Sequence, residues 1–305
     1  MTEVSGQYLV PVDIGGKNYL MVVDTGAQTA LTPAAVDMMG LATDYMPTHR
    51  IAGIGTGGSR IQDNRMIPSL KLGPLEWTQL KVAMGSMFVP KQPEEQPQVV
   101  GLLGSDILSR YDIEFDFAAK QMMFYSVRNC AGWFVPWPEK YYRYAPAPVK
   151  LDYFSDILRA RKFLMPVTLN GHPARAVLDT GAVRSIVTKK AARNVGLGEQ
   201  ERNPFLEVPV THFSGFGEKT IPTYVYRFDT LEIGPFSFQH IPLAVVDTDL
   251  NQEDMLLGMD FMGSQRVWIS YSNNLVFMQP VAPSAWQAME RSAPPVLPAP
   301  PQANP

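Results

Sequence analysis

The segments VVDTGAQTAL at residues 22–31 and VLDTGAVRSI at residues 177–186 place the same tetrapeptide, Asp-Thr-Gly-Ala, twice in one chain. Each copy follows a run of apolar residues that is typical of a buried strand. The two aspartates, Asp24 and Asp179, are 155 residues apart. One Asp-Thr-Gly is most simply a structural turn, but two copies in matching surroundings require a common explanation.

The residues around the two motifs repeat in the same order. The longest match joins YLVPVDIGGKNYLMVVDTGA (8–27) with FLMPVTLNGHPARAVLDTGA (163–182). Three further segments match in sequence: AGIG (52–55) with SGFG (214–217), LGPLEW (72–77) with IGPFSF (233–238), and LLGSDIL (102–108) with LLGMDFM (256–262). Four ordered correspondences indicate an internal duplication.

The composition and patterning predict a β protein. Apolar residues make up 46% of the 305 residues and charged residues 18%, which is typical of a globular protein. Short apolar strands are separated by turns, of which Gly15-Gly16 and Asn170-Gly171 are strong hairpin signals. Brief helices are expected near 33–39, near 188–195 and after each LLG. We therefore predict an all-β fold of two closely similar β domains with short helices.

The repeat also sets the domain boundaries that we expect. The linker contains many aromatic residues, which are expected to lie along the surfaces of the lobes. The tail is rich in Pro and Ala, a composition that favours an extended or disordered segment. The expected parts are an N-terminal lobe at 1–125, the aromatic linker at 126–162, a C-terminal lobe at 163–279 and the tail at 280–305.

Charge and hydropathy exclude some classes of partner. The net charge of −3 gives no electrostatic reason to expect nucleic acid. No apolar run reaches the ~18–20 residues that span a bilayer. The first ten residues lack the basic start and apolar core of a signal peptide. We therefore expect a cytoplasmic protein, or a periplasmic or secreted one if an upstream signal has been removed.

Two facing Asp-Thr-Gly loops would create a pair of carboxyl groups. In each loop the glycine lets a backbone N–H donate to the aspartate, while the threonine hydroxyl bonds inward. Two carboxylates this close cannot both ionise, so they share one proton and titrate as a unit. The ionised member can deprotonate a water while the other donates to a carbonyl oxygen. The pattern predicts direct hydrolysis of an amide bond by Asp24 and Asp179.

These motifs resemble the retropepsin branch of the pepsin-like aspartic proteases, arranged in tandem. DTGAQ (24–28) is similar to the motif of bacterial and DNA-damage-inducible-type retropepsins. LLGSDIL (102–108) and LLGMDFM (256–262), called the LLG segments below, resemble the second signature of the family. In the family this segment crosses behind the active loop and begins a short helix. The resemblance covers residues 7–125 and 163–279. It implies an all-β fold of two β-barrel lobes in a pseudo-twofold arrangement. It also implies an aspartic endopeptidase that cleaves extended polypeptide, with apolar residues preferred around the cut.

The resemblance also implies a role for each matching residue. Asp24 and Asp179 resemble the catalytic pair. The residues that resemble its supports are Thr25, Gly26, Ala27, Thr180, Gly181 and Ala182. The residues that resemble flaps and substrate contacts are Gly53, Ile54, Gly55, Gly215, Phe216, Gly217, Gln28 and Val183.

The chain departs from the family pattern at several places. Gln28 and Val183 stand where viral members often carry an acidic residue that grips the substrate backbone. The two LLG segments also lack the arginine that viral members carry there. Ala27 and Ala182 replace a Ser or Thr that donates to the carboxylate in pepsin-like members. Because alanine cannot donate, we expect the pair to work closer to neutral pH than digestive pepsins do.

Other readings of the motifs are weaker. GIGTGG (53–58) satisfies the G-x-G-x-x-G dinucleotide fingerprint, but the residues after it lack the helical periodicity that this site needs. The four histidines have no metal-ligand spacing, so we expect neither a metal nor a cofactor. The main alternative is an inactive pseudoprotease that binds peptides or proteins, and a third is an assembly module built on linker and tail. Intact Asp, Thr and Gly in both motifs favour the enzyme.

The two halves can pair within one chain or between two chains. The linker is long enough for either arrangement. A tethered partner is present at roughly millimolar effective concentration, which favours pairing within the chain. The difference between Gln28 and Val183 also suits one site with unlike sides. We therefore expect a monomer with a single site, and a homodimer is the alternative.

Overall fold

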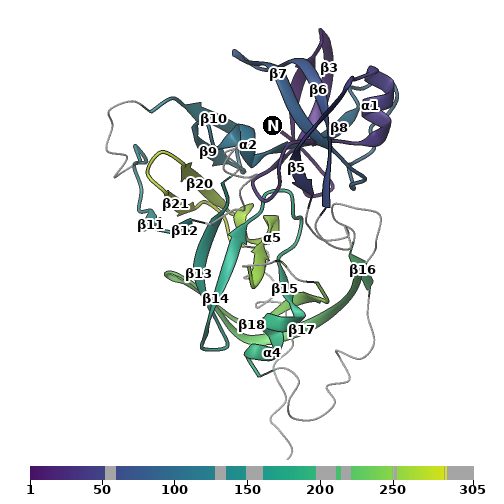
Figure 1. Cartoon of the computed structure of the whole chain (residues 1–305). Coiled ribbons are helices and arrows are strands. Elements are labelled where there is room, and N and C mark those ends of the chain that lie inside the picture. Colours follow the sequence, from purple (N-terminus) through teal and green to yellow (C-terminus); the bar gives the residue numbers. More distant parts are fainter. Residues whose placement is uncertain are drawn as a thin grey trace, which may run out of the picture.

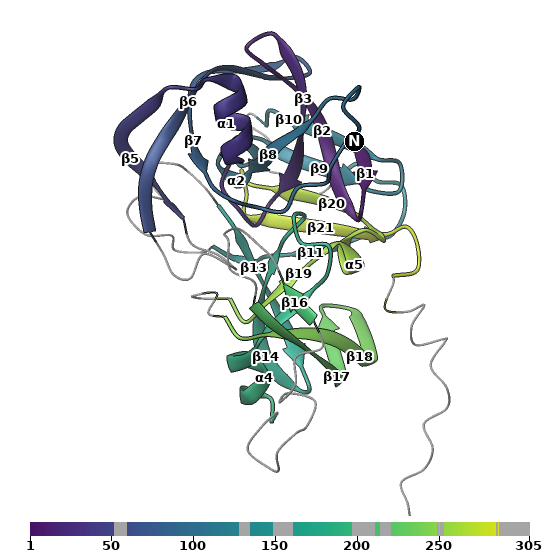
Figure 2. The same cartoon turned by 90° about the vertical axis from the view of Figure 1, so that its right-hand side faces the viewer.

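The computed structural model describes residues 1–51, 60–127, 135–148, 161–196, 211–213, 221–248, 250, 253–284 and 286. Two β lobes, coloured purple to blue and teal to green, are joined by a third sheet that lies between them (Figures 1 and 2). The chain is mostly β with a few short helices, as the sequence predicts. Among the described residues, no helix is long and apolar enough to cross a membrane.

Six strands of the N-terminal lobe close into a barrel. They pair in the order β2-β3-β8-β4-β7-β6, and β6 closes the ring by pairing with β2. β1 and β5 extend the sheet at its two edges. The elements are β1 (Thr2–Val4), β2 (Gln7–Ile14), β3 (Lys17–Asp24), β4 (Ala30–Leu31), α1 (Pro33–Met39), β5 (Thr43–Ile51), β6 (Arg60–Leu72), β7 (Leu75–Met84), β8 (Val99–Gly104) and α2 (Ser105–Leu108).

The C-terminal lobe repeats this plan strand for strand. Its barrel order is β13-β14-β19-β15-β18-β17, closed by β17 on β13, so the predicted duplication is confirmed. The edge strands are β12 and β16. The elements are β12 (Ala147–Pro148), β13 (Phe163–Leu169), β14 (His172–Leu178), β15 (Ile186–Thr188), α4 (Lys189–Asn194), β16 (Thr211–Phe213), β17 (Ile221–Ile233), β18 (Phe236–Val246), β19 (Met255–Leu257) and α5 (Met259–Met262).

Local sequence explains the hairpins and helices. Gly15-Gly16 and Asn170-Gly171 all have positive φ, as a two-residue hairpin turn requires. Helix α1 begins after Thr32, whose side chain accepts a hydrogen bond from Ala35 N at 3.2 Å. Helix α4 begins in the same way after Thr188. The four helices expected from the sequence are therefore present where they were predicted.

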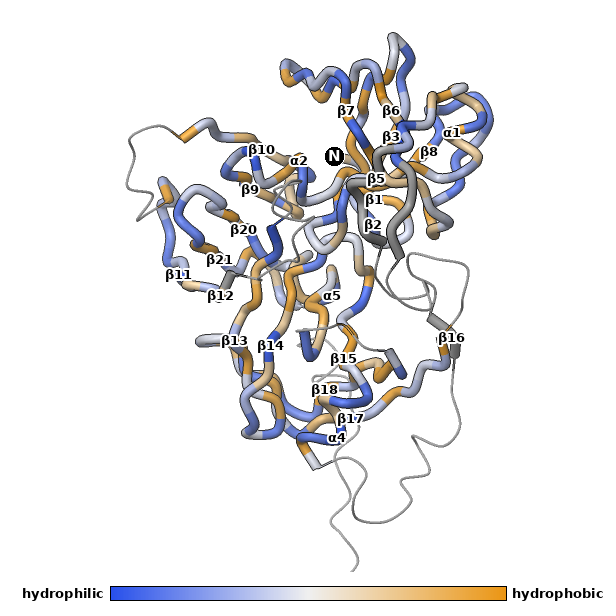
Figure 3. Tube along the Cα trace, in the orientation of Figure 1, coloured by the Kyte–Doolittle hydropathy of each residue, from blue (hydrophilic) through white to orange (hydrophobic). Residues whose placement is uncertain are grey.

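The hydrophobic core is continuous from one lobe to the other. Hydrophobic and hydrophilic residues alternate along barrel strands in Figure 3, as expected when one face of a strand points inward. The largest cluster includes buried Met21 and Met165 from the two barrels and buried Ile113 and Val267 from the sheet between them. Burial of this shared core holds the two lobes together.

The sheet between the lobes combines strands from both halves of the chain. β9 of the N-terminal half pairs with β20 of the C-terminal half over Arg266↔Asp116 to Ile269↔Ile113. Part of the aromatic linker, β11, adds an edge strand to this sheet. The order is β10-β9-β20-β21-β11, formed by β9 (Asp112–Asp116), β10 (Gln121–Tyr125), β11 (Tyr142–Tyr144), β20 (Gln265–Ser270) and β21 (Leu275–Pro280).

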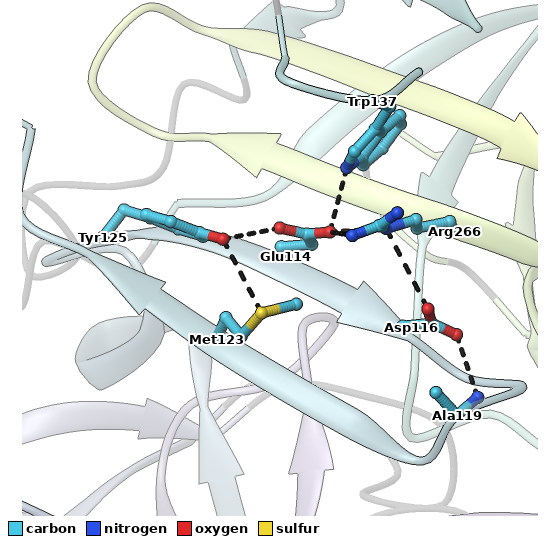
Figure 4. Close-up of polar contacts among 7 residues, drawn as sticks. All are labelled: Glu114, Asp116, Ala119, Met123, Tyr125, Trp137 and Arg266. Atoms are coloured by element: carbon cyan, nitrogen blue, oxygen red, sulfur yellow. Dashed lines mark hydrogen bonds and ion pairs between the residues drawn. The ribbon is translucent and has the colours of Figure 1, made fainter. Parts of the chain in front are cut away.

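A buried carboxylate connects the linker with both halves of this sheet (Figure 4). Glu114 accepts hydrogen bonds from Trp137 Nε1 at 2.9 Å, Tyr125 Oη at 2.7 Å and Arg266 Nε at 2.5 Å. The Glu114 side chain is only 2% exposed. Arg266 also stacks over the Trp137 ring at 5.1 Å. The described part of the linker, 135–148, thus packs against the sheet that joins the lobes.

The segment after β21 contains a buried anchor within the expected tail. Trp286 is 2% exposed, stacks on Phe261 at 5.5 Å and packs edge-on against Phe238 at 5.0 Å. Its Nε1 donates to Asp260 Oδ2 at 3.2 Å. The residues from 287 onward lie outside the described residues, as do 128–134 and 149–160 of the linker.

Replacing Trp286 with Ala is expected to lower the free energy of unfolding by about 3–5 kcal/mol, because the substitution empties a packed aromatic site. Urea unfolding at neutral pH measures the loss. Trp286→Phe is the matched control and should lose less, since it keeps the ring packing and removes only the N–H donor. A loss below about 1 kcal/mol for the Ala variant would mean that this segment does not stabilise the fold.

Candidate active site

The two Asp-Thr-Gly loops occupy equivalent places in the two barrels. Asp24 is the last residue of β3 and pairs with Gly104 of the parallel strand β8. Asp179 follows β14, and its N–H donates to Leu257 O of the parallel strand β19 at 3.0 Å. Each loop therefore leaves its barrel beside the LLG segment of its own lobe.

The two threonines lock the loops together across the lobe boundary. Thr25 N donates to Thr180 Oγ1 at 3.0 Å, and Thr180 N donates to Thr25 Oγ1 at 3.1 Å. Each hydroxyl then donates to the strand of the opposite lobe, Thr25 to Leu178 O at 2.7 Å and Thr180 to Val23 O at 2.8 Å. Both side chains are buried. Four reciprocal bonds fix the position of one loop relative to the other.

The two glycines bring the carboxyl groups face to face. Gly26 N donates to Asp24 Oδ1 and Gly181 N donates to Asp179 Oδ1, both at 2.9 Å. A Cβ added at Gly26 would lie 2.5 Å from Asp179 Cγ, and one added at Gly181 would lie 2.5 Å from Asp24 Cγ. Each carboxyl thus packs against the glycine of the other loop, a place that no larger residue can occupy.

Burial and mutual repulsion perturb this pair of acids. Burial and then the charge of Asp179 raise the pKa of Asp24 well above its ordinary value of 3.8. Burial also raises the pKa of Asp179, while Lys162 and the N–H groups of Ala182 and Gly181 oppose that rise. One proton shared between the two carboxyls accounts for these shifts.

In each lobe, the aspartate of the LLG segment accepts hydrogen bonds from the residues that follow the Asp-Thr-Gly motif. Asp106 Oδ1 accepts from Thr29 N at 2.6 Å and from Thr29 Oγ1 at 2.8 Å. Asp260 Oδ1 accepts from Ser185 N at 2.9 Å and from Ser185 Oγ at 2.6 Å. The sequence shows that an arginine is missing here but does not predict these bonds. The aspartate that recurs in LLGSDIL and LLGMDFM was the available signal.

Glycines of the LLG segments allow this close support. A Cβ at Gly258 would lie 2.6 Å from Ala182 O, and a Cβ at Gly104 would overlap the backbone between Gln28 and Thr29. Either loop would have to move away from its supporting segment if these glycines carried a side chain. The recurrence of glycine in both segments therefore has a steric cause.

The predicted substrate-contacting residues differ in their surroundings. Gln28 is half-buried, whereas Val183 is 37% exposed and faces Gly6. Val183 also borders a pocket of about 230 Å³ with Tyr8 and Met259. The flap residues Gly53, Ile54, Gly55, Gly215, Phe216 and Gly217 lie outside the described residues.

Comparisons with known proteins match both lobes. Residues 10–107 match the family model described as aspartyl protease, and residues 165–264 match the gag-polyprotein aspartyl protease family. No curated protein matches the sequence significantly.

Two solved structures are among those that match this chain. One is a retropepsin-like aspartic protease from Rickettsia conorii, with 18% identity over 46% of this chain and 98% of that chain, at a TM-score of 0.33. The other is an aspartic proteinase from Irpex lacteus, with 11% identity over 92% of this chain and 95% of that chain, at a TM-score of 0.49.

Proposed function

The chain consists of two retropepsin-like aspartyl protease domains in tandem, and we propose that it is an aspartic endopeptidase that hydrolyses peptide bonds of extended polypeptide. The observation that carries this proposal is the reciprocal packing of Asp24 and Asp179 against the glycines of the opposite loops. This packing gives two facing carboxyls that share one proton, which is the arrangement that water-mediated amide hydrolysis needs.

The reaction uses the two carboxyls in opposite protonation states. The ionised member of the pair takes a proton from a water molecule, and the water oxygen attacks the peptide carbonyl carbon. The protonated member donates its proton to the carbonyl oxygen, which gives a neutral diol. The carboxyl that took the water proton now gives it to the nitrogen of the leaving amine. The other carboxyl, now ionised, takes a proton from a diol hydroxyl as the C–N bond breaks. A carboxyl and an amino terminus are released, and the pair again holds one proton.

Cleavage of a denatured polypeptide between pH 3 and pH 8 tests the proposal. We expect cleavage that an aspartate-directed transition-state analogue blocks, with an optimum closer to neutral pH than that of digestive pepsins. Two features support this optimum: the raised pKa of Asp24 and the absence of a hydroxyl donor at Ala27 and Ala182. Peptide binding without turnover at any pH would instead indicate a pseudoprotease. An optimum as acidic as that of the stomach enzymes would contradict the electrostatic argument.

Asp24→Asn is expected to stabilise the protein at neutral pH. The ordinary pKa of 3.8 applies in the unfolded chain, and the pKa of Asp24 in the folded chain is well above it. The contribution of Asp24 to stability is therefore fully present below about pH 3.8 and is lost as the pH rises through the folded pKa. Thermal unfolding should show a larger gain for the variant at pH 8 than at pH 3. An equal shift at both pH values would contradict a raised pKa.

A further inference from the structure

Lys162 immediately precedes β13, the strand that pairs with the strand leading to Asp179. The pairing of β13 with β14 ends at Leu164↔Val177, and continuing this register just past the ends of both strands puts Lys162 level with Asp179. Side chains directly opposite each other in an antiparallel pair share one face, with Cβ atoms about 4.5–5.5 Å apart. The extended register therefore places the partly buried Lys162 as a neighbour of Asp179, in agreement with its charge acting on that acid.

The N-terminal lobe has a neutral residue at the equivalent place. The pairing Leu9↔Val22 brings Gln7 opposite Asp24 in the same way. Gln7 is buried, and its Nε2 donates to Gly181 O in the loop of the other lobe at 3.3 Å. A side chain at this position thus reaches the junction of the two loops. Because the lobes repeat the same plan, Lys162 approaches that junction from the opposite side.

The charge of Lys162 acts unequally on the two carboxyls. Burial raises the pKa of both acids. At Asp179, the positive charge of Lys162 is the largest of the effects that lower the pKa against burial. At Asp24, the hydrogen bond from Gly26 N lowers the pKa more than Lys162 does. This order agrees with the strand register, which places Lys162 nearer to Asp179.

We propose that Lys162 is a positioning residue that keeps Asp179 ionised and leaves the shared proton on Asp24. The two aspartates of this chain then have fixed roles, Asp179 as the base toward water and Asp24 as the acid toward the carbonyl oxygen. This inference rests on the proposed endopeptidase activity and assigns the direction of its proton transfers.

Other charged groups around the loops have different partners. Asp106 and Asp260 each hold the backbone of their own loop. Arg161 Nη1 donates to Tyr271 O at 3.1 Å, and Arg184 is exposed. Among the described residues, Lys162 is therefore the cation whose charge acts on both Asp24 and Asp179.

Lys162→Gln tests the proposal by giving both lobes the residue found at Gln7. We expect the acidic limb of the pH profile of kcat/KM to move to higher pH by about one unit, because the carboxylate loses a nearby positive charge. This is the smallest shift expected for such a charge, since Lys162 is partly exposed and solvent weakens its effect. Lys162→Arg should keep the wild-type profile. Lys17→Gln is the matched control, since Lys17 lies at the far end of β3 from Asp24. An unchanged profile in Lys162→Gln, or the same shift in Lys162→Arg, would overturn the proposal.

A second measurement separates this inference from the proposed activity. Carbon-13 NMR of labelled aspartate carboxyls follows the titration of the pair directly, with Asp24→Asn and Asp179→Asn proteins to assign the signals. We expect Lys162→Gln to move the carboxyl titrations to higher pH whether or not a peptide is cleaved. A shift without any cleavage in the wild type would refute the endopeptidase alone. Cleavage with unshifted titrations would refute the role of Lys162 alone.

Discussion

Asp24→Asn and Asp179→Asn are each expected to lower kcat/KM for peptide cleavage by about 10⁴-fold, the upper range for losing general acid–base catalysis. An amide is nearly the same size as a carboxyl, so each variant should fold. It can neither take a proton from water nor return one to the substrate. The rate of cleavage of a fluorogenic peptide, measured with the wild type under the same conditions, gives the loss.

Asp13→Asn is the matched control for this loss. Asp13 Oδ1 accepts a hydrogen bond from Gly16 N in an exposed turn, and asparagine can accept the same bond. This variant should keep wild-type activity. If either variant of the pair retained more than about a tenth of wild-type activity, the aspartates would not be the acid and base of the reaction.

Glu114→Met is expected to lower the free energy of unfolding by about 3–5 kcal/mol, because it breaks a buried ion pair from one side. The variant leaves Arg266 with only the long ion pair to Asp116 at 4.0 Å and removes the acceptor for Trp137 and Tyr125. Arg266 lies on β20 and Glu114 on β9, so the damage falls on the contact between the two halves of the chain. Urea unfolding of the variant and the wild type measures the difference.

The double variant Glu114→Met, Arg266→Met is the control. Two apolar side chains at this site leave no unpaired charge, so the double variant should be more stable than Glu114→Met alone. A change below about 1 kcal/mol in the single variant would mean that this ion pair does not hold the sheet together.

Short-range patterns made much of the fold predictable. Gly15-Gly16 and Asn170-Gly171 determine hairpins through their backbone freedom, and Thr32 and Thr188 cap helices within a few residues. The repeat then related the two halves, because segments with the same pattern fold in the same way. The pairing of Asp24 with Asp179 was predictable only because both loops carry the same motif.

Contacts between distant and dissimilar residues could not be predicted in this way. Nothing in the sequence near Glu114 points to Arg266, which is 152 residues away and reaches it only after the lobes associate. Trp286 lies in a segment whose composition favours disorder, yet its ring is buried against Phe261. Lys162 becomes a neighbour of Asp179 only through the strand register. Side-chain packing in three dimensions decides each of these cases.

The central claim is that one chain builds one active site from its two lobes. Mixing Asp24→Asn protein with Asp179→Asn protein tests this claim most directly. In the structure, Thr25 and Thr180 of the same chain bond reciprocally, so every chain in the mixture carries one damaged pair. We predict that the mixture is as inactive as either variant alone. Recovery of activity on mixing would show that intact pairs form between chains and would contradict the single-chain site.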